Sequence, residues 1–192
     1  MFLAGLRALA ETDIKKIVAL STLSQLGLMF FSVGLGGALI TFFHLISHAF
    51  TKAFLFIVIG YFIHLASDFQ DMRKLGVMGG SESKLSFFIG ISSFSLCGYP
   101  FILVYYSKET IVELLIRGRT SGVGWVVLLL RSLTLTMTYS TRLFLAVFFS
   151  HNRGALFFRS LANSLRQKSA HHRIVYFFMI INFFSYSIFR AL

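Results

Sequence analysis

Two histidines and a lysine recur every four residues inside one apolar segment of the chain: His44, His48 and Lys52. On an α-helix this spacing places the three side chains along one stripe, with about 6 Å of rise between neighbours. Histidine titrates near neutral pH, and burial lowers the pKa of a lysine by several units. The stripe is therefore suited to passing protons, with water molecules bridging the gaps.

Two other roles compete for the same stripe. Each histidine could simply bond to a neighbouring helix and fix its packing, or His44 and His48 could share a metal ion. Charged groups inside a membrane are costly and usually face a bundle interior or a wet cavity, so three aligned groups favour the proton path. A metal is disfavoured because no Asp, Glu or Cys stands nearby in the sequence and Lys52 would repel the cation.

A second group of charged residues follows the break "GYP" at residues 98–100, in the stretch "YYSKETIVE". Proline interrupts a helix, and a helix broken at membrane depth is tolerated only beside water or other protein. Lys108 is thus a candidate proton carrier, with Glu109 or Glu113 as its charge partner. The alternative is that Lys108 extends to the membrane surface and the acids are ordinary charges at a helix end.

Three further charged or titratable residues lie in apolar segments without an obvious carrier role. His64 lies near the far end of the helix that carries the stripe, and Arg131 and Arg142 lie on a later one. Arginine does not lose its proton in proteins, so both are expected to be structural partners or to set the local field. The Ser and Thr residues between the arginines could line a polar face or bond between helices.

The elements that must hold these residues are membrane helices. Of the 192 residues 56% are hydrophobic and only 13% are charged, with 24 Phe and one Pro, whereas a soluble domain has about 25% charged residues. Apolar runs near the length of a bilayer predict an all-α, polytopic transmembrane helix bundle. The expected helices cover residues 2–10, 14–35, 38–66, 85–98, 101–116, 123–149 and 174–189.

Charge and cysteine content narrow the function further. The net charge of +11 collects partly in a loop over residues 150–173 that has five Lys or Arg and no acid. Such charge sets membrane topology or meets anionic headgroups, so nucleic acid is not an expected partner. Cys97 is the only cysteine, which excludes internal disulfides and cysteine-based metal clusters. We expect a membrane region at 1–149, followed by a basic loop and a final helix at 150–192.

Several stretches, taken in order, resemble one family over about residues 6–149. They are "ALAETDIKKIVALSTLSQLGLMF", "HLISHAFTKAFLF", "QDMRKLGVMGG", "YYSKETIVE" and "YSTR". Together they resemble the C-terminal part of the subunit 5 family of mitochondrial NADH:ubiquinone oxidoreductase, respiratory complex I. That family belongs to the antiporter-like proteins, which include subunits of multi-subunit Na⁺/H⁺ antiporters.

The resemblance implies roles for individual residues. Lys52 matches a central proton-channel lysine, and His44 and His48 match histidines that connect it along a hydrated axis. Lys108 matches a lysine on a discontinuous helix in the outlet half-channel. The family has Asp where Glu109 stands and a small residue where Val104 stands. No family role transfers to Arg131.

The resemblance also implies a setting. It implies a membrane-arm subunit of complex I that takes part in proton translocation coupled to NADH-to-ubiquinone electron transfer, in the mitochondrial inner membrane. Flavin and iron–sulfur clusters are expected in other subunits, with no cofactor and no redox chemistry in this chain. The expected partners are other membrane-arm subunits and phospholipid such as cardiolipin. The alternatives are a subunit of a cation/H⁺ antiporter, or a structural remnant kept for assembly with no working proton path.

The resemblance implies that the chain holds only part of one antiporter-like repeat. Residues 2–10 form about 13 Å of helix, against about 30 Å of hydrocarbon. An exposed helix end in lipid leaves unpaired backbone groups, each costing several kcal/mol. We therefore expect a separate chain to carry the N-terminal half of the subunit and to meet this one at residues 2–10. The alternative is that the gene product is itself longer than this sequence.

Overall fold

The computed structural model describes residues 1–65, 69–72, 83–100, 102–118 and 122–149. Within these residues the chain is helical and has no strand beyond an isolated bridge. The helices are α1 (Phe2–Ala10), α2 (Ile14–Gly34), α3 (Ala38–Leu65), α6 (Ser83–Cys97), α7 (Leu103–Arg117) and α8 (Val123–Phe149). The predicted basic loop and the helix expected at 174–189 lie outside the described residues.

Three of these helices are long and apolar enough to cross a membrane. The spanning segments are Ile14–Gly34, Ala38–His64 and Val123–Ala146, while α6 has a shorter apolar stretch, Phe87–Cys97. The prediction of an all-α transmembrane bundle is confirmed, and the predicted helices agree with the observed ones to within about two residues at most ends. A helix of 28 residues such as α3 is about 42 Å long, so it must tilt or protrude from a bilayer.

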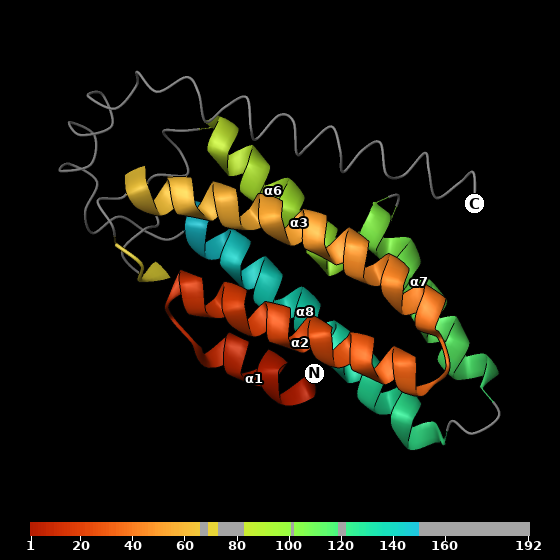
Figure 1. Cartoon of the computed structure of the whole chain (residues 1–192). Helices are drawn as coiled ribbons and strands as arrows, with labels where there is room; N and C mark the ends of the chain where they lie inside the picture. Colours follow the sequence, from red (N-terminus) through yellow and green to blue (C-terminus); the bar gives the residue numbers. More distant parts are fainter. Residues whose placement is uncertain (66–68, 73–82, 101, 119–121, 150–192) are drawn as a thin grey trace.

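Helix α3 is the centre of the arrangement (Figure 1). It packs against α2 on one side and against α6 and α7 on the other. Helix α8 closes the bundle by packing mainly on α1 and α6, with smaller contacts to α2 and α7. Any side chain on the inner faces of α3 is therefore surrounded by other helices.

Glycines end two of the helices in the same way. Gly36 and Gly98 both have positive φ, 85° and 82° respectively, a conformation that glycine adopts without strain. After α6, the amide N–H groups of Gly98 and Tyr99 donate to the carbonyls of Ser95 and Phe94 at 3.1 Å each. This is the Schellman pattern, and it turns the chain at the predicted break between α6 and α7.

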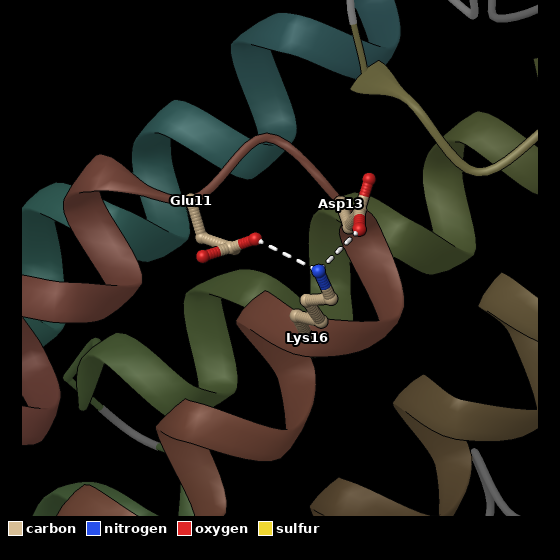
Figure 2. A network of polar contacts seen from close by, with 3 residues as sticks. All are labelled: Glu11, Asp13 and Lys16. Atoms are coloured by element: carbon tan, nitrogen blue, oxygen red, sulfur yellow. Dashed lines mark ion pairs between the residues drawn. The ribbon is translucent and has the colours of Figure 1, made fainter.

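The turn between α1 and α2 carries surface ion pairs and is joined to a later segment of the chain. Asp13 stands before α2, but its carboxylate does not cap a backbone N–H. Instead Lys16 lies between Asp13, at 3.0 Å, and Glu11, at 3.4 Å (Figure 2). Backbone bonds of 3.1 Å join Ile14 N–H to Gln70 O and Met72 N–H to Thr12 O. The segment after α3 is thereby attached to the start of α2.

Candidate functional site

The three residues of the predicted stripe lie on the inner side of α3. His44 is fully buried, and His48 and Lys52 are 6% and 4% exposed. The rings of His44 and His48 have centroids 6.1 Å apart, the distance expected of neighbours one helical turn apart. The structure thus brings the stripe together inside the bundle, because α3 is covered by α2, α6 and α7.

Helix α2 supplies the hydrogen-bond partners of the stripe. The ammonium group of Lys52 donates to the hydroxyl of Ser21, and His44 Nε2 lies 3.4 Å from Gln25 Oε1. Our reading of the sequence did not single out Ser21, Ser24 or Gln25 as site residues. Their spacing, i, i+3 and i+4, places them on one face of a helix. This shared face was the one sequence feature that could have identified them as site residues. All three are buried.

Helix α7 approaches the stripe from the opposite side. Ser107 Oγ lies 2.7 Å from His44 Nδ1 and 3.4 Å from Ser47 Oγ. His44 therefore contacts α2 through one ring nitrogen and α7 through the other. Ser107 is a further site residue that our reading of the sequence did not single out, although it directly precedes Lys108.

Lys108 is held by the break in the helix. Its side chain is 7% exposed, and its Nζ donates to the carbonyl oxygen of Leu96 at 2.6 Å. This carbonyl belongs to the last turn of α6, where a helix leaves acceptors without an intrahelical partner. The prediction that Lys108 lies beside an interrupted helix is confirmed, and the ammonium group satisfies an acceptor that the break exposes.

Helix α8 contacts the end of α6 at this break. Cys97, the last residue of α6, has its Sγ 2.7 Å from Ser140 Oγ on α8. On the same helix the hydroxyl of Tyr139 lies 3.3 Å from Ser24 Oγ of α2. The polar interior therefore includes side chains from α2, α3, α6, α7 and α8.

The structure does not bring the other predicted residues into this cluster. Glu109 is exposed on α7, because the residue after Lys108 is turned about 100° around the helix. Glu113 is exposed as well and pairs with Arg117 at 3.7 Å. The prediction that one of these acids is the charge partner of Lys108 is therefore corrected, since the partner observed is the carbonyl of Leu96.

His64, Arg131 and Arg142 also lie away from the stripe. His64 is exposed at the end of α3, and Arg131 is exposed on α8. Arg142 is partly buried, and one of its terminal guanidinium nitrogens has no hydrogen-bond partner among the described residues. Across all the residues that the structure describes, no three His, Cys, Asp or Glu side chains lie close enough to hold a metal ion.

A buried ring nitrogen of His48 indicates a place for a bound water molecule. His48 Nε2 is buried and has no hydrogen-bond partner among the described residues. Buried polar atoms in native proteins are almost always bonded to protein or to ordered water. A water molecule beside His48 would extend the polar contacts along α3 from His44 toward Lys52.

A family model covers most of the chain that carries this cluster. Residues 1–138 match the model described as NADH:quinone oxidoreductase/Mrp antiporter, transmembrane. The chain belongs to the NADH:quinone oxidoreductase/Mrp antiporter family. The stripe on α3, its partners on α2, and Lys108 on α7 all lie within the matched residues.

Curated members of the NADH:quinone oxidoreductase/Mrp antiporter family align with the same region. NADH-ubiquinone oxidoreductase chain 5 of Lumbricus terrestris is 41% identical over 150 residues, which are 78% of this chain and 26% of that one. The Locusta migratoria protein of the same name is 44% identical over 146 residues, which are 75% of this chain and 25% of that one. The chain thus spans about a quarter of the length of these relatives.

Two solved structures of membrane complexes share the fold. A chain in the Mrp complex from Dietzia sp. DQ12-45-1b superposes with a TM-score of 0.66 at 26% identity, over 84% of this chain and 19% of that one. A chain of respiratory complex I from Thermus thermophilus with bound aureothin superposes with a TM-score of 0.62 at 20% identity. That match covers 93% of this chain and 40% of the other. The bundle therefore has the antiporter-like membrane fold.

Proposed function

We propose that this chain forms part of a proton path in a membrane-arm subunit of respiratory complex I. The observation that carries the proposal is the buried line of His44, His48, Lys52 and Lys108 between α2 and α7. Titratable groups at membrane depth are expensive, and they mark ion or proton pathways by default.

The geometry suggests a role for each group. Lys52 is the central carrier, because its ammonium group can pass a proton and its neighbour Ser21 can accept a hydrogen bond from it. His44 and His48 relay protons along α3 by exchanging protons on their ring nitrogens with neighbouring hydroxyls and water. Lys108 is the carrier next to the break, where the carbonyl of Leu96 stabilises its charged form.

The setting of the path is part of the same proposal. Curated relatives at about 40% identity are named NADH-ubiquinone oxidoreductase chain 5, which supports a place in the mitochondrial inner membrane. Electron transfer from NADH to ubiquinone, with its flavin and iron–sulfur clusters, would take place in other subunits. The partners would be other membrane-arm subunits and phospholipid such as cardiolipin.

A separate chain that carries the N-terminal half of the subunit stays a prediction. Helix α1 packs on α2 and α8 through Ala4, Gly5 and Ala8, while Leu3 and Leu6 on its other side are exposed. That exposed side is the surface on which a helix of a second chain would pack. A structure of the assembled complex tests this by revealing whether another polypeptide contacts α1.

The second candidate function is a subunit of a cation/H⁺ antiporter. The observation that favours it is the match to the Mrp complex, which has the higher TM-score of the two solved structures. The two functions differ in their energy source. A complex I subunit moves protons only when NADH is oxidised, whereas an antiporter subunit moves them against a cation gradient without NADH.

Proton pumping by a Lys52→Ala variant tests the proposal. We expect pumping in reconstituted vesicles to be largely lost, while NADH oxidation by an artificial acceptor persists, because no redox group is touched. Lys15→Ala is the matched control, since Lys15 is an exposed lysine at the start of α2. Pumping by Lys52→Ala equal to that of the control would contradict the proposal.

A further inference from the structure

Helix α8 carries a stripe of polar side chains on its exposed face. Arg131, Thr134, Thr138 and Thr141 are all exposed, and they recur at intervals of three, four and three residues. This spacing places them on one side of the helix. The other exposed side chains of α8 around them are large and apolar, among them Leu128, Leu130, Met137 and Leu145. The polar stripe therefore interrupts an otherwise apolar surface.

Arg131 lies well inside the spanning segment of α8. It comes eight residues after Val123, the first residue of that segment, so about 12 Å of helix separate it from the nearer end. Arginine keeps its proton in proteins. A charge at this depth is costly in lipid, and such side chains pair with other groups or face water. The guanidinium group of Arg131 therefore requires an anionic partner.

Arg131 points away from the helices on which this part of α8 packs. Leu129, two residues earlier, is 3% exposed and lies in one core cluster with Ile111 and Leu115 of α7 and Leu28 of α2. Residues two positions apart on an α-helix point about 200° apart around its axis. The side of α8 that carries Arg131 is consequently opposite to α7.

The acids of this chain are not placed to neutralise Arg131. Glu109 and Glu113 lie on α7, on the opposite side of α8. No Asp or Glu follows Glu113 in the sequence, so residues 150–192 carry no acidic side chain. The remaining acids among the described residues lie at the turn between α1 and α2, near the far end of α8 (Figure 1): Glu11, Asp13 and Asp71.

A lipid phosphate is the other anion that an arginine near a membrane surface meets. It would satisfy Arg131 alone, whereas the stripe continues to Thr141, about 15 Å further along the helix. The threonine hydroxyls donate to their own helix, as Thr138 does to Leu135 O at 2.9 Å, and their oxygens can still accept a hydrogen bond. Such small polar side chains are typical of contacts between membrane helices. A stripe of this length fits a second helix better than a headgroup.

We propose that a membrane helix of another polypeptide packs on the polar stripe of α8 and pairs an Asp or Glu side chain with Arg131. Helix α8 is also the least buried of the three spanning helices in the described part of the chain. The contact uses only the exposed face of α8, so it does not depend on whether the buried groups conduct protons.

A photoreactive amino acid in place of Thr138 identifies what covers the stripe in the assembled complex. The same amino acid at Met137 is the matched control, because Met137 is 47% exposed at nearly the same depth but points about 100° away around the helix. We expect position 138 to cross-link more than position 137 to an apolar peptide of another polypeptide that contains Asp or Glu. Cross-links only to lipid, to residues 150–192 or to a peptide without an acid would overturn the proposal.

Arg131→Leu tests the ion pair itself. Leucine suits a side chain that faces lipid, so a lipid-exposed Arg131 would lose nothing in this variant. If Arg131 pairs with a carboxylate, the variant leaves that acid unpaired, and the amount of assembled complex should fall roughly threefold to tenfold. Arg131→Lys should lose less, and Arg131→Glu combined with an arginine in place of the partner's acid should restore assembly.

Arg117→Leu is the matched control for the loss of an exposed arginine. Arg117 pairs with Glu113 at the surface end of α7, where an ion pair contributes little. Assembly of this variant should equal that of wild type. Assembly of Arg131→Leu equal to that of Arg117→Leu, or no recovery when the two charges are exchanged, would overturn the proposal.

Discussion

At the scale of single residues, the buried hydroxyls of this bundle form two groups. Within the described part of the chain, some bond only to their own helix, as when Ser92 donates to Ile89 O at 2.9 Å and Ser132 to Leu129 O at 2.7 Å. Others also contact a second helix, as Ser107 contacts His44 and Ser21 accepts from Lys52. Hydroxyls of the first group find their hydrogen-bond acceptor within their own helix, so they do not indicate which helix packs beside it. Hydroxyls of the second group bond across two helices and therefore require those helices to be in contact.

This difference explains which site residues could be predicted from the sequence. His44, His48, Lys52 and Lys108 stand out because titratable groups in apolar segments are rare and must face an interior. Ser107 and Gln25 do not stand out, because a serine or glutamine in a membrane helix has several ways to satisfy its polar atoms. Only the packing of α2, α3 and α7 distinguishes the partners of the stripe from ordinary helix residues.

Gly98→Ala should disturb Lys108 at the break. Gly98 has φ 82°, and a Cβ there would lie 3.3 Å from Cδ of Lys108. The backbone conformation alone costs an alanine about 1–2 kcal/mol. We expect lower thermal stability of the complex and reduced pumping.

Gly60→Ala is the control for this substitution. Gly60 is exposed within α3, and a Cβ there meets nothing within 4 Å. Alanine is favoured over glycine in a helix, so stability should be kept or raised. Equal stability and pumping of the two variants would show that the conformation of Gly98 does not matter.

At the scale of elements, helix ends were predictable because the residues that end helices act locally. Helix α2 ends within one residue of its predicted end, and the break at residues 98–100 separates α6 from α7 as expected. The attachment of residues 70–72 to the turn between α1 and α2 was not predictable. It is made by backbone groups, which every residue has, and by the burial of Met72.

Met72→Ser should detach this segment. Met72 is 4% exposed and packs in a core cluster with Ile14, Ile17 and Phe62. Loss of a buried methionine side chain costs about 2 kcal/mol or more. We expect a lower melting temperature of the complex for Met72→Ser.

Lys16→Ala is the comparison at the same turn. Lys16 is exposed and pairs with Glu11 and Asp13 only at the surface (Figure 2), where ion pairs contribute little. The melting temperature of the complex with Lys16→Ala should stay close to that of wild type. A larger fall for Lys16→Ala than for Met72→Ser would indicate that charges, and not burial, hold the turn.

At the scale of the whole molecule, the bundle has an apolar surface and a polar cluster set within an otherwise apolar core. Phe30 and Leu39 are 78% and 83% exposed, whereas His44 and Lys52 are buried. This arrangement is expected of a protein whose surface meets lipid and whose polar groups face the bundle interior. The chain spans about a quarter of the length of its curated relatives.

The hydration of the interior tests the central claim most directly. A structure of the assembled complex at a resolution that locates water would show whether the groups on α3 and α7 are connected. We predict ordered water bonded to His48 Nε2, in a chain that joins Lys52, His48 and His44 and continues to Lys108. A dry interior, with His48 Nε2 bonded only to protein groups and no water between Lys52 and Lys108, would contradict a proton path and favour a structural remnant.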